Sequence, residues 1–162
     1  MRTALPDLAS DSPVQTELYG EALGRALRRG DVLALSGPLG AGKTCLVRGI
    51  VAGAGGDAAT VRSPTFVLHQ PHRAARLTVH HIDLYRLGPG SSLDVLDLDG
   101  LLAEGAVVIE WAEYGDLAGY APSGVTIEPG VLDHQRVLHL DEHAHEHIAC
   151  AWKATSSGGV TA

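Results

Sequence analysis

The chain is 162 residues long, 45% of its residues are hydrophobic and 4% are aromatic, and its formal net charge at pH 7 is −7. This length predicts one domain, and the composition is ample for a core of Leu, Val, Ala and Ile. The acidic charge argues against a protein that grips nucleic acid alone, because contacts to phosphates dominate that affinity.

The cysteines Cys45 and Cys150 lie far apart in the sequence. This separation argues against a disulfide framework and predicts a reducing, cytoplasmic location. The first twelve residues lack the apolar segment of a signal peptide, and no apolar stretch is long enough to cross a bilayer. We therefore expect no membrane association.

The N-terminal residues 1–11 are polar and are predicted to be loose. A helix is expected over residues 12–30, with Ser12 as its N-cap, Pro13 in the first turn and Gln15 completing a capping box. Its apolar residues recur every four positions and predict the buried face, which is formed by Val14, Leu18, Ala22 and Ala26, with Leu23 and Leu27 beside them.

A glycine-rich loop, Gly37–Thr44, lies between an apolar strand predicted over residues 31–36 and a helix predicted over 45–52. It matches the phosphate-binding (Walker A) pattern G-x-x-x-x-G-K-[ST] in the context of strand, loop and helix that the pattern needs. The alternative is a glycine-rich turn with an incidental lysine. In the preferred interpretation Lys43 reaches the β- and γ-phosphates of a nucleotide and the Thr44 hydroxyl ligates Mg²⁺. The nucleotide-binding residues predicted here are Gly37, Pro38, Leu39, Gly40, Ala41, Gly42, Lys43, Thr44 and Cys45.

The remaining elements alternate between apolar strands and short polar or helical segments. They are a possible hairpin of strands 61–70 and 77–85 around a polar turn at 71–76, an acidic helix at 91–103, a buried strand at 106–109, an antiparallel pair at 125–128 and 136–140, a last strand at 148–152 and a flexible tail at 154–162. Together they predict an α/β fold. It consists of a single P-loop NTPase-like domain over residues 12–153, with a mixed central sheet, flanking helices and an antiparallel extension.

Two carboxylates, Asp83 and Glu110, each close an apolar strand, and this is where α/β sheets place their sites. Mg²⁺ beside a bound nucleotide would compensate a carboxylate buried there, although an ordinary strand end that emerges into solvent is equally compatible with the pattern. Ser63 and Thr65 lie about twenty residues after the loop, where a hydroxyl can sense a γ-phosphate through the metal. A proline-bent strand entrance is the simpler interpretation of that segment taken alone.

The C-terminal part is rich in histidine, with three at alternating positions in residues 141–147. On a strand this spacing would put all three on one face and would suit zinc. The segment is charged and lacks cysteine, so we favour a solvated surface.

Four motifs occur in a fixed order: the phosphate loop, Ser63–Phe66, His81–Leu87 with its D-x-Y-R-L pattern, and Ile109–Glu113 with Glu110-Trp111. In this combination, over about residues 12 to 140, the chain resembles the bacterial TsaE family. The segment after D-x-Y-R-L, the Ala112 that follows the tryptophan and the histidine-rich C-terminal part depart from the usual family pattern.

The resemblance implies an ATPase that binds ATP with Mg²⁺ and hydrolyses it slowly alone. It also implies association with the TsaD and TsaB proteins, which carry out threonylcarbamoylation of the adenosine next to the anticodon in tRNAs that read ANN codons. tRNA would be contacted only indirectly, through that complex.

The site residues implied by the resemblance follow the motifs. Lys43, Asp83 and Glu110 would be catalytic, and Thr44, Glu110 and Asp83 would lie on the metal side. The further residues implied are Ser63 and Thr65 in a switch-like segment, Trp111, and Pro13 near the adenine.

Two other functions compete for the same loop. A small-molecule kinase would need an acceptor pocket and commonly an arginine-rich lid, for which the chain has no sizeable insertion. A GTP-dependent switch would need a guanine-reading N-K-x-D motif, and Lys153, the lysine outside the loop, is followed by Ala154.

Overall fold

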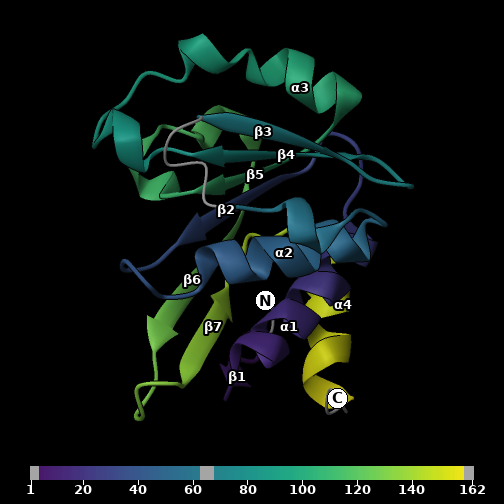
Figure 1. The fold of residues 1–162 in the computed structure, drawn as a ribbon, viewed down its shortest axis with the longest axis vertical. Coiled ribbons are helices and arrows are strands. Elements are labelled where there is room, and N and C mark those ends of the chain that lie inside the picture. Colours follow the sequence, from purple (N-terminus) through teal and green to yellow (C-terminus); the bar gives the residue numbers. More distant parts are fainter. Residues whose placement is uncertain (1–3, 63–67, 159–162) are drawn as a thin grey trace.

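The computed structural model describes residues 4–62 and 68–158. These residues form one seven-stranded sheet in the order β1-β7-β6-β2-β5-β4-β3 (Figure 1). β6, β2, β5 and β4 run parallel, and antiparallel pairings add β3 at one edge and β7 and β1 at the other. The strands are β1 (Leu8–Ser10), β2 (Val32–Ser36), β3 (His69–Arg73), β4 (Thr78–Asp83), β5 (Gly105–Glu110), β6 (Ser123–Pro129) and β7 (Arg136–Leu140). The predicted α/β fold, with a mixed sheet and an antiparallel extension, is confirmed.

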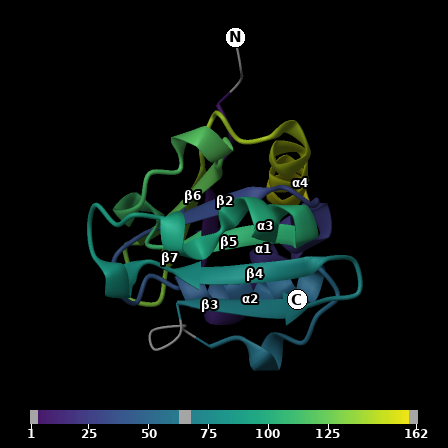
Figure 2. The ribbon, with the colours of Figure 1, turned by 90° about the horizontal axis from the view of Figure 1, so that it is seen from above.

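Helices cover both faces of the sheet (Figures 1 and 2). The α-helices of the described part are α1 (Pro13–Ala26), α2 (Lys43–Gly53), α3 (Leu98–Glu104) and α4 (Glu146–Ser157), and 3-10 turns lie at Ala58–Thr60, Tyr85–Leu87, Asp94–Leu96, Ala112–Tyr114 and Ala118–Tyr120. Side chains alternate along β5, so Val108 joins the apolar cluster under α1, α2 and α4, whereas Val107 and Ile109 join the cluster under α3. The sheet is therefore buried on both faces, as its uniformly apolar central strands predict.

The helix start predicted at Ser12 is present, because the Ser12 side chain accepts a hydrogen bond from the Gln15 backbone N–H at 3.1 Å. The predicted buried face of this helix is right only in part. Leu23 and Leu27 are buried as predicted, but Val14 is 61% exposed, and the unpredicted Tyr19 is buried. The apolar spacing was misleading because the closest side of α1 carries glycines rather than large side chains.

Glycines let α1 and α2 cross with their backbones in contact. A Cβ atom built on Gly20 would lie 2.3 Å from the carbonyl oxygen of Leu46, and one on Gly24 would lie 2.1 Å from that of Ile50. In return, Cβ atoms on Gly49 and Gly53 would lie 2.0 and 2.1 Å from carbonyl oxygens of α1. No side chain fits at this crossing, which holds α2 and the loop before it against α1.

Both ends of the chain are more ordered than the sequence predicts. Residues 8–10, expected in a loose segment, pair with β7, and Leu8 is buried. Residues 148–152, predicted as a strand, belong to α4, which also continues through 154–157 of the predicted flexible tail. Ile148 and Trp152 are four positions apart and both are fully buried, so they face the core from one side of a helix.

The predicted hairpin is present, but its turn is shorter than expected. β3 and β4 pair antiparallel, and residues 71–73, predicted to be in the turn, belong to β3. Pro71 is tolerated because β3 is an edge strand. The predicted helix at 91–103 is interrupted at Asp97, whose φ of 44° separates a 3-10 turn from α3.

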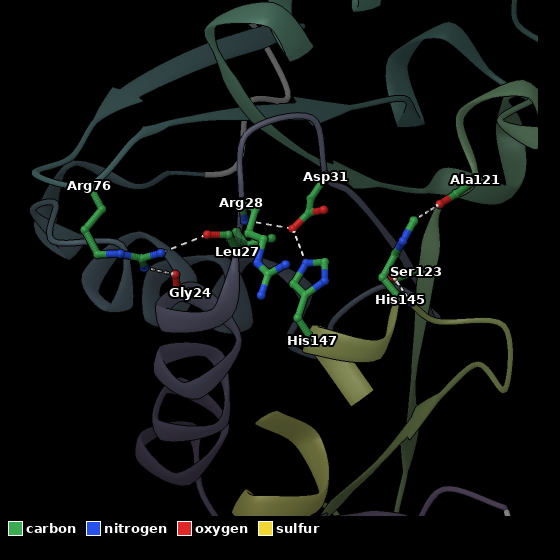
Figure 3. Close-up of polar contacts among 9 residues, drawn as sticks. All are labelled: Gly24, Leu27, Arg28, Asp31, Arg76, Ala121, Ser123, His145 and His147. Atoms are coloured by element: carbon green, nitrogen blue, oxygen red, sulfur yellow. Dashed lines mark hydrogen bonds and ion pairs between the residues drawn. The ribbon is translucent and has the colours of Figure 1, made fainter. Parts of the chain in front are cut away.

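The chain segments at the N-terminal ends of the parallel strands are tied together by polar contacts (Figure 3). The Arg76 guanidinium donates to the carbonyl oxygens of Gly24 and Leu27, at 2.8 Å each, and so caps the C-terminus of α1. Asp31, just before β2, lies 2.7 Å from His147 Nε2 of α4 through its Oδ2.

Two histidines of the histidine-rich segment thus hold the chain in place, because His145 also donates its backbone N–H to Ser123 Oγ at 3.0 Å. The segment forms a turn and the start of α4, so it is not the strand on which the zinc alternative would have depended. His143 has the solvent exposure that we expected of the whole segment.

Candidate functional site

The loop Gly37–Gly42 joins β2 to α2, so the predicted order of strand, loop and helix is confirmed. Gly37, Gly40 and Gly42 have φ values of 154°, 77° and 104°. Gly42 is the N-cap of α2 and provides no side-chain hydrogen bond to the first helical N–H groups. These N–H groups and the positive end of the helix dipole form the kind of cradle that binds phosphate.

Lys43, the first residue of α2, folds over this loop. Its side chain is buried, and Nζ donates to the carbonyl oxygens of Gly37 at 2.6 Å and Pro38 at 3.0 Å. Nζ also lies 4.2 Å from the centre of the Trp111 ring, within the range of a cation–π contact. Burial lowers the pKa of Lys43 below its ordinary value. The ammonium group is therefore held at the loop and is poorly solvated.

The two predicted carboxylates lie side by side, since Asp83 of β4 is paired in register with Glu110 of β5. Each residue is 3% exposed. Glu110 Oε1 accepts hydrogen bonds from Thr44 Oγ1 at 2.8 Å and from His81 Nε2 at 2.9 Å. The structure therefore joins the start of α2 to the ends of two strands through one carboxylate oxygen.

Asp83 occupies a different environment. Its Oδ1 accepts a hydrogen bond from the backbone N–H of Tyr85 at 2.9 Å. Burial raises the pKa of Asp83 above its ordinary value of 3.8, and the negative charge of Glu110 acts in the same direction. The two carboxylates thus differ in their partners, a difference that the sequence left open.

An aromatic group lies next to the carboxylates. The ring of Trp111 is 4.9 Å from that of Tyr85 and 5.3 Å from that of Tyr114, measured between centroids. Trp111 has a φ of 55°, in the left-handed region that is unusual for a bulky residue. This backbone conformation follows Glu110 directly and turns the indole toward Lys43, so Trp111 forms one wall of the site.

The start of α1 contacts the first turn of α2 beside the loop. The Cys45 thiol donates to the carbonyl oxygen of Pro13 at 3.2 Å, which places these two predicted nucleotide-binding residues next to each other. Burial raises the pKa of the Cys45 thiol to about 11. Cys45 therefore remains a neutral thiol that joins α1 to α2.

Arg136, at the start of β7, was not predicted as a site residue. Its Nε donates to the carbonyl oxygen of Ala41 at 3.1 Å and its Nη2 to that of Gly40 at 3.2 Å. Its Nη1 donates to the carbonyl oxygens of Asp133 and Gln135 at 2.6 and 2.7 Å. The guanidinium fork thus ties the phosphate loop to the β6–β7 turn. No local sequence pattern marks this arginine as a site residue, because its partners in the loop are backbone atoms about 95 residues away.

The donor set suits Mg²⁺, which prefers oxygen ligands and usually retains several waters. Thr44 and Glu110 supply a hydroxyl and a carboxylate in direct contact, with Asp83 beside them. Over residues 4–62 and 68–158, no group of three or more His, Cys, Asp or Glu residues is arranged to hold a metal ion by itself. The site therefore fits a cation shared with nucleotide phosphates rather than a closed protein cage. The predicted Ser63 and Thr65 lie outside the described residues.

The family model named "Threonylcarbamoyl adenosine biosynthesis protein TsaE" matches residues 10–141. A Mycobacterium leprae protein with the name "tRNA threonylcarbamoyladenosine biosynthesis protein TsaE" is 47% identical over 105 residues, which are 59% of this chain and 65% of the relative. A Treponema pallidum protein of the same name is 40% identical over 107 residues, 64% of this chain and 76% of the relative.

The crystal structure of Bacillus subtilis YdiB has the same fold, with a TM-score of 0.70 and 20% sequence identity over 96% of this chain and 99% of that one. Within the described part of the chain, no helix has the length and apolar character required to cross a membrane. The family match covers the loop, both carboxylates and Trp111, in the order that the resemblance required. The chain belongs to the TsaE family.

Proposed function

We propose that this protein is a Mg²⁺-dependent ATPase, slow on its own, that serves threonylcarbamoylation of the adenosine next to the anticodon in tRNAs reading ANN codons. The observation that carries the proposal is the 2.8 Å contact between Thr44 Oγ1 and Glu110 Oε1. It brings a hydroxyl from the phosphate loop and a carboxylate from a strand end to one point. P-loop proteins use such a pair to hold Mg²⁺.

The proposed nucleotide site is built from this chain's own groups. Backbone N–H groups of the loop and the start of α2 would bind the phosphates, and Lys43 would exchange the Gly37 and Pro38 carbonyls for phosphate oxygens. Thr44 and Glu110 would hold Mg²⁺, which when bound neutralises charge on the β- and γ-phosphates. Asp83, with its raised pKa, would lie on the water side as the orienting carboxylate.

The proposed partners are the TsaD and TsaB proteins, with tRNA reached through them. The net charge of −7 supports this arrangement, because an acidic chain binds the backbone of a nucleic acid poorly on its own and a partner would hold the tRNA. The family and relative names support the pathway. The proposed place of action is the cytoplasm, where this tRNA chemistry would take place.

The test is threonylcarbamoyl formation on tRNA over many cycles, in a mixture of the TsaD–TsaB pair, the threonylcarbamoyl adenylate, tRNA and ATP. We expect product to rise only when this protein and ATP are both present. Lys43→Ala should fail through lost phosphate contact, and Glu110→Gln should fold and lose turnover. Lys153→Ala is the matched control because this lysine lies on α4, far from the loop in the sequence.

If the same amount of product forms with and without this protein, while the protein still binds ATP, the proposed role in tRNA modification is refuted. The assignment of the phosphate site would still stand. A screen of small-molecule phosphate acceptors would then test the kinase alternative. Unchanged ATP affinity and activity in Lys43→Ala would refute the phosphate-site assignment itself.

A further inference from the structure

Two adjacent histidines on β4 face opposite sides of the sheet. His80 is 2% exposed, and its Nδ1 lies 2.9 Å from His69 Nε2 of β3. His81 is fully buried and points to the face covered by α2, where its Nε2 lies 2.9 Å from Glu110 Oε1. One strand thus carries two buried imidazoles, and one of them touches the candidate site.

The contact with Glu110 determines which nitrogen of His81 carries the proton. An ionised carboxylate accepts hydrogen bonds but cannot donate one, so Nε2 must be protonated. The other ring nitrogen, Nδ1, is buried and has no hydrogen-bond partner within the described part of the chain. A buried polar atom without a partner costs free energy, so a histidine that served packing alone would be a poor choice here.

The same carboxylate oxygen also receives the Thr44 hydroxyl. A hydroxyl has one proton to donate and lone pairs that remain free for a cation, so Thr44 can keep this bond while it ligates a metal. A glutamate side chain has three rotatable bonds, whereas the His81 ring is fully buried and lies near the His72 ring of β3, with ring centroids 6.1 Å apart. His81 therefore limits the orientations open to Glu110.

We propose that His81 is a positioning residue, which holds the Glu110 carboxylate toward Thr44 and so sets the affinity of the site for Mg²⁺. This inference rests on the proposed nucleotide site. Partners that orient a metal ligand in this way typically change metal affinity by about 10–100-fold when they are removed.

The test compares three variants of the full-length protein. His81→Leu removes the donor, and His81→Gln keeps a donor because the amide nitrogen is as far from Cβ as Nε2 is. His80→Leu is the matched control, since it removes a neighbouring imidazole of similar burial that faces away from the site. Each is measured by calorimetric titration of ATP at several Mg²⁺ concentrations, by ATP turnover and by thermal unfolding.

We expect His81→Leu to raise the Mg²⁺ concentration for half-maximal ATP binding by about 10–100-fold. His80→Leu should lower the melting temperature with the Mg²⁺ requirement unchanged, and His81→Gln should stay within about threefold of the wild type, below that range. If His81→Leu and His80→Leu require the same Mg²⁺ concentration, the inference is wrong.

A second measurement needs neither nucleotide nor a variant. Nitrogen-15 spectra of the histidine side chains should show His81 protonated at Nε2, and a neutral ring protonated at Nδ1 would overturn the inference even if His81→Leu fails to fold. Wild-type protein without Mg²⁺-dependent ATP binding would refute the proposed function as well. If the wild type binds ATP in a Mg²⁺-dependent way and His81→Leu has the same Mg²⁺ requirement, only this inference is refuted.

Discussion

The crossing of α1 and α2 offers a direct test of the packing that positions the phosphate loop. Gly24→Ala adds a Cβ that would lie 2.1 Å from the carbonyl oxygen of Ile50, although real Cβ atoms essentially never approach closer than 3.0 Å. The obstacle is helix backbone rather than a flexible side chain, so the two helices must separate by about 1 Å at this point.

The magnitude follows from two opposing effects. Overpacking costs about 1–3 kcal/mol, and we place this backbone clash at the upper end. Alanine offsets about 1 kcal/mol of that through its higher helix propensity. The net loss of about 2 kcal/mol corresponds to a fall in melting temperature of about 4–8 °C for a domain of this size.

The assay is thermal unfolding followed by circular dichroism, with ATP affinity as a second measurement because α2 begins at Lys43. Gly119→Ala is the control, since a Cβ at Gly119 has no atom within 4 Å in the structure. Its melting temperature should stay within about 2 °C of the wild type. If Gly24→Ala melts at or above the temperature of the wild type, the backbone contact does not constrain the helices and the reasoning fails.

Three further predictions concern single side chains. Arg136→Ala should weaken ATP binding about tenfold in calorimetry, because the loop loses its hydrogen bonds to the arginine at the β6–β7 turn. Arg136→Lys should recover only part of the lost affinity, because an ammonium group lacks the guanidinium fork. Equal ATP affinity in the wild type and both variants would contradict this reasoning. A thiol reagent at about pH 8 should label exposed Cys150 and leave Cys45, whose pKa burial raises to about 11, unlabelled until the protein is denatured. Burial lowers the pKa of His80 below its ordinary 6.5, so the unfolded chain takes up the proton first and stability should fall as pH drops below about 6.5. In chemical denaturation His80→Gln should flatten that pH dependence, and an unchanged slope would show that other groups cause it.

Local patterns predicted the parts of this protein that depend on neighbouring residues. The loop Gly37–Thr44 was identifiable because its glycines, its lysine and the apolar runs on both sides are contiguous. Asp83 and Glu110 were identifiable as strand ends, and parallel pairing of β4 with β5 brings them into register. Residues 148–152 were mispredicted because a five-residue apolar run fits a buried strand or one side of a helix equally well.

By itself the sequence determined the α/β class, the phosphate loop and the family motifs, since each is a matter of spacing along the chain. The tertiary structure alone decided that α1 meets α2 through glycines, that Arg136 reaches the loop, and that His81 and Thr44 share one oxygen of Glu110. These contacts join elements that are far apart in the sequence. They depend on strand order, register and the distance between helices, which are set by packing of the whole domain rather than by local preference.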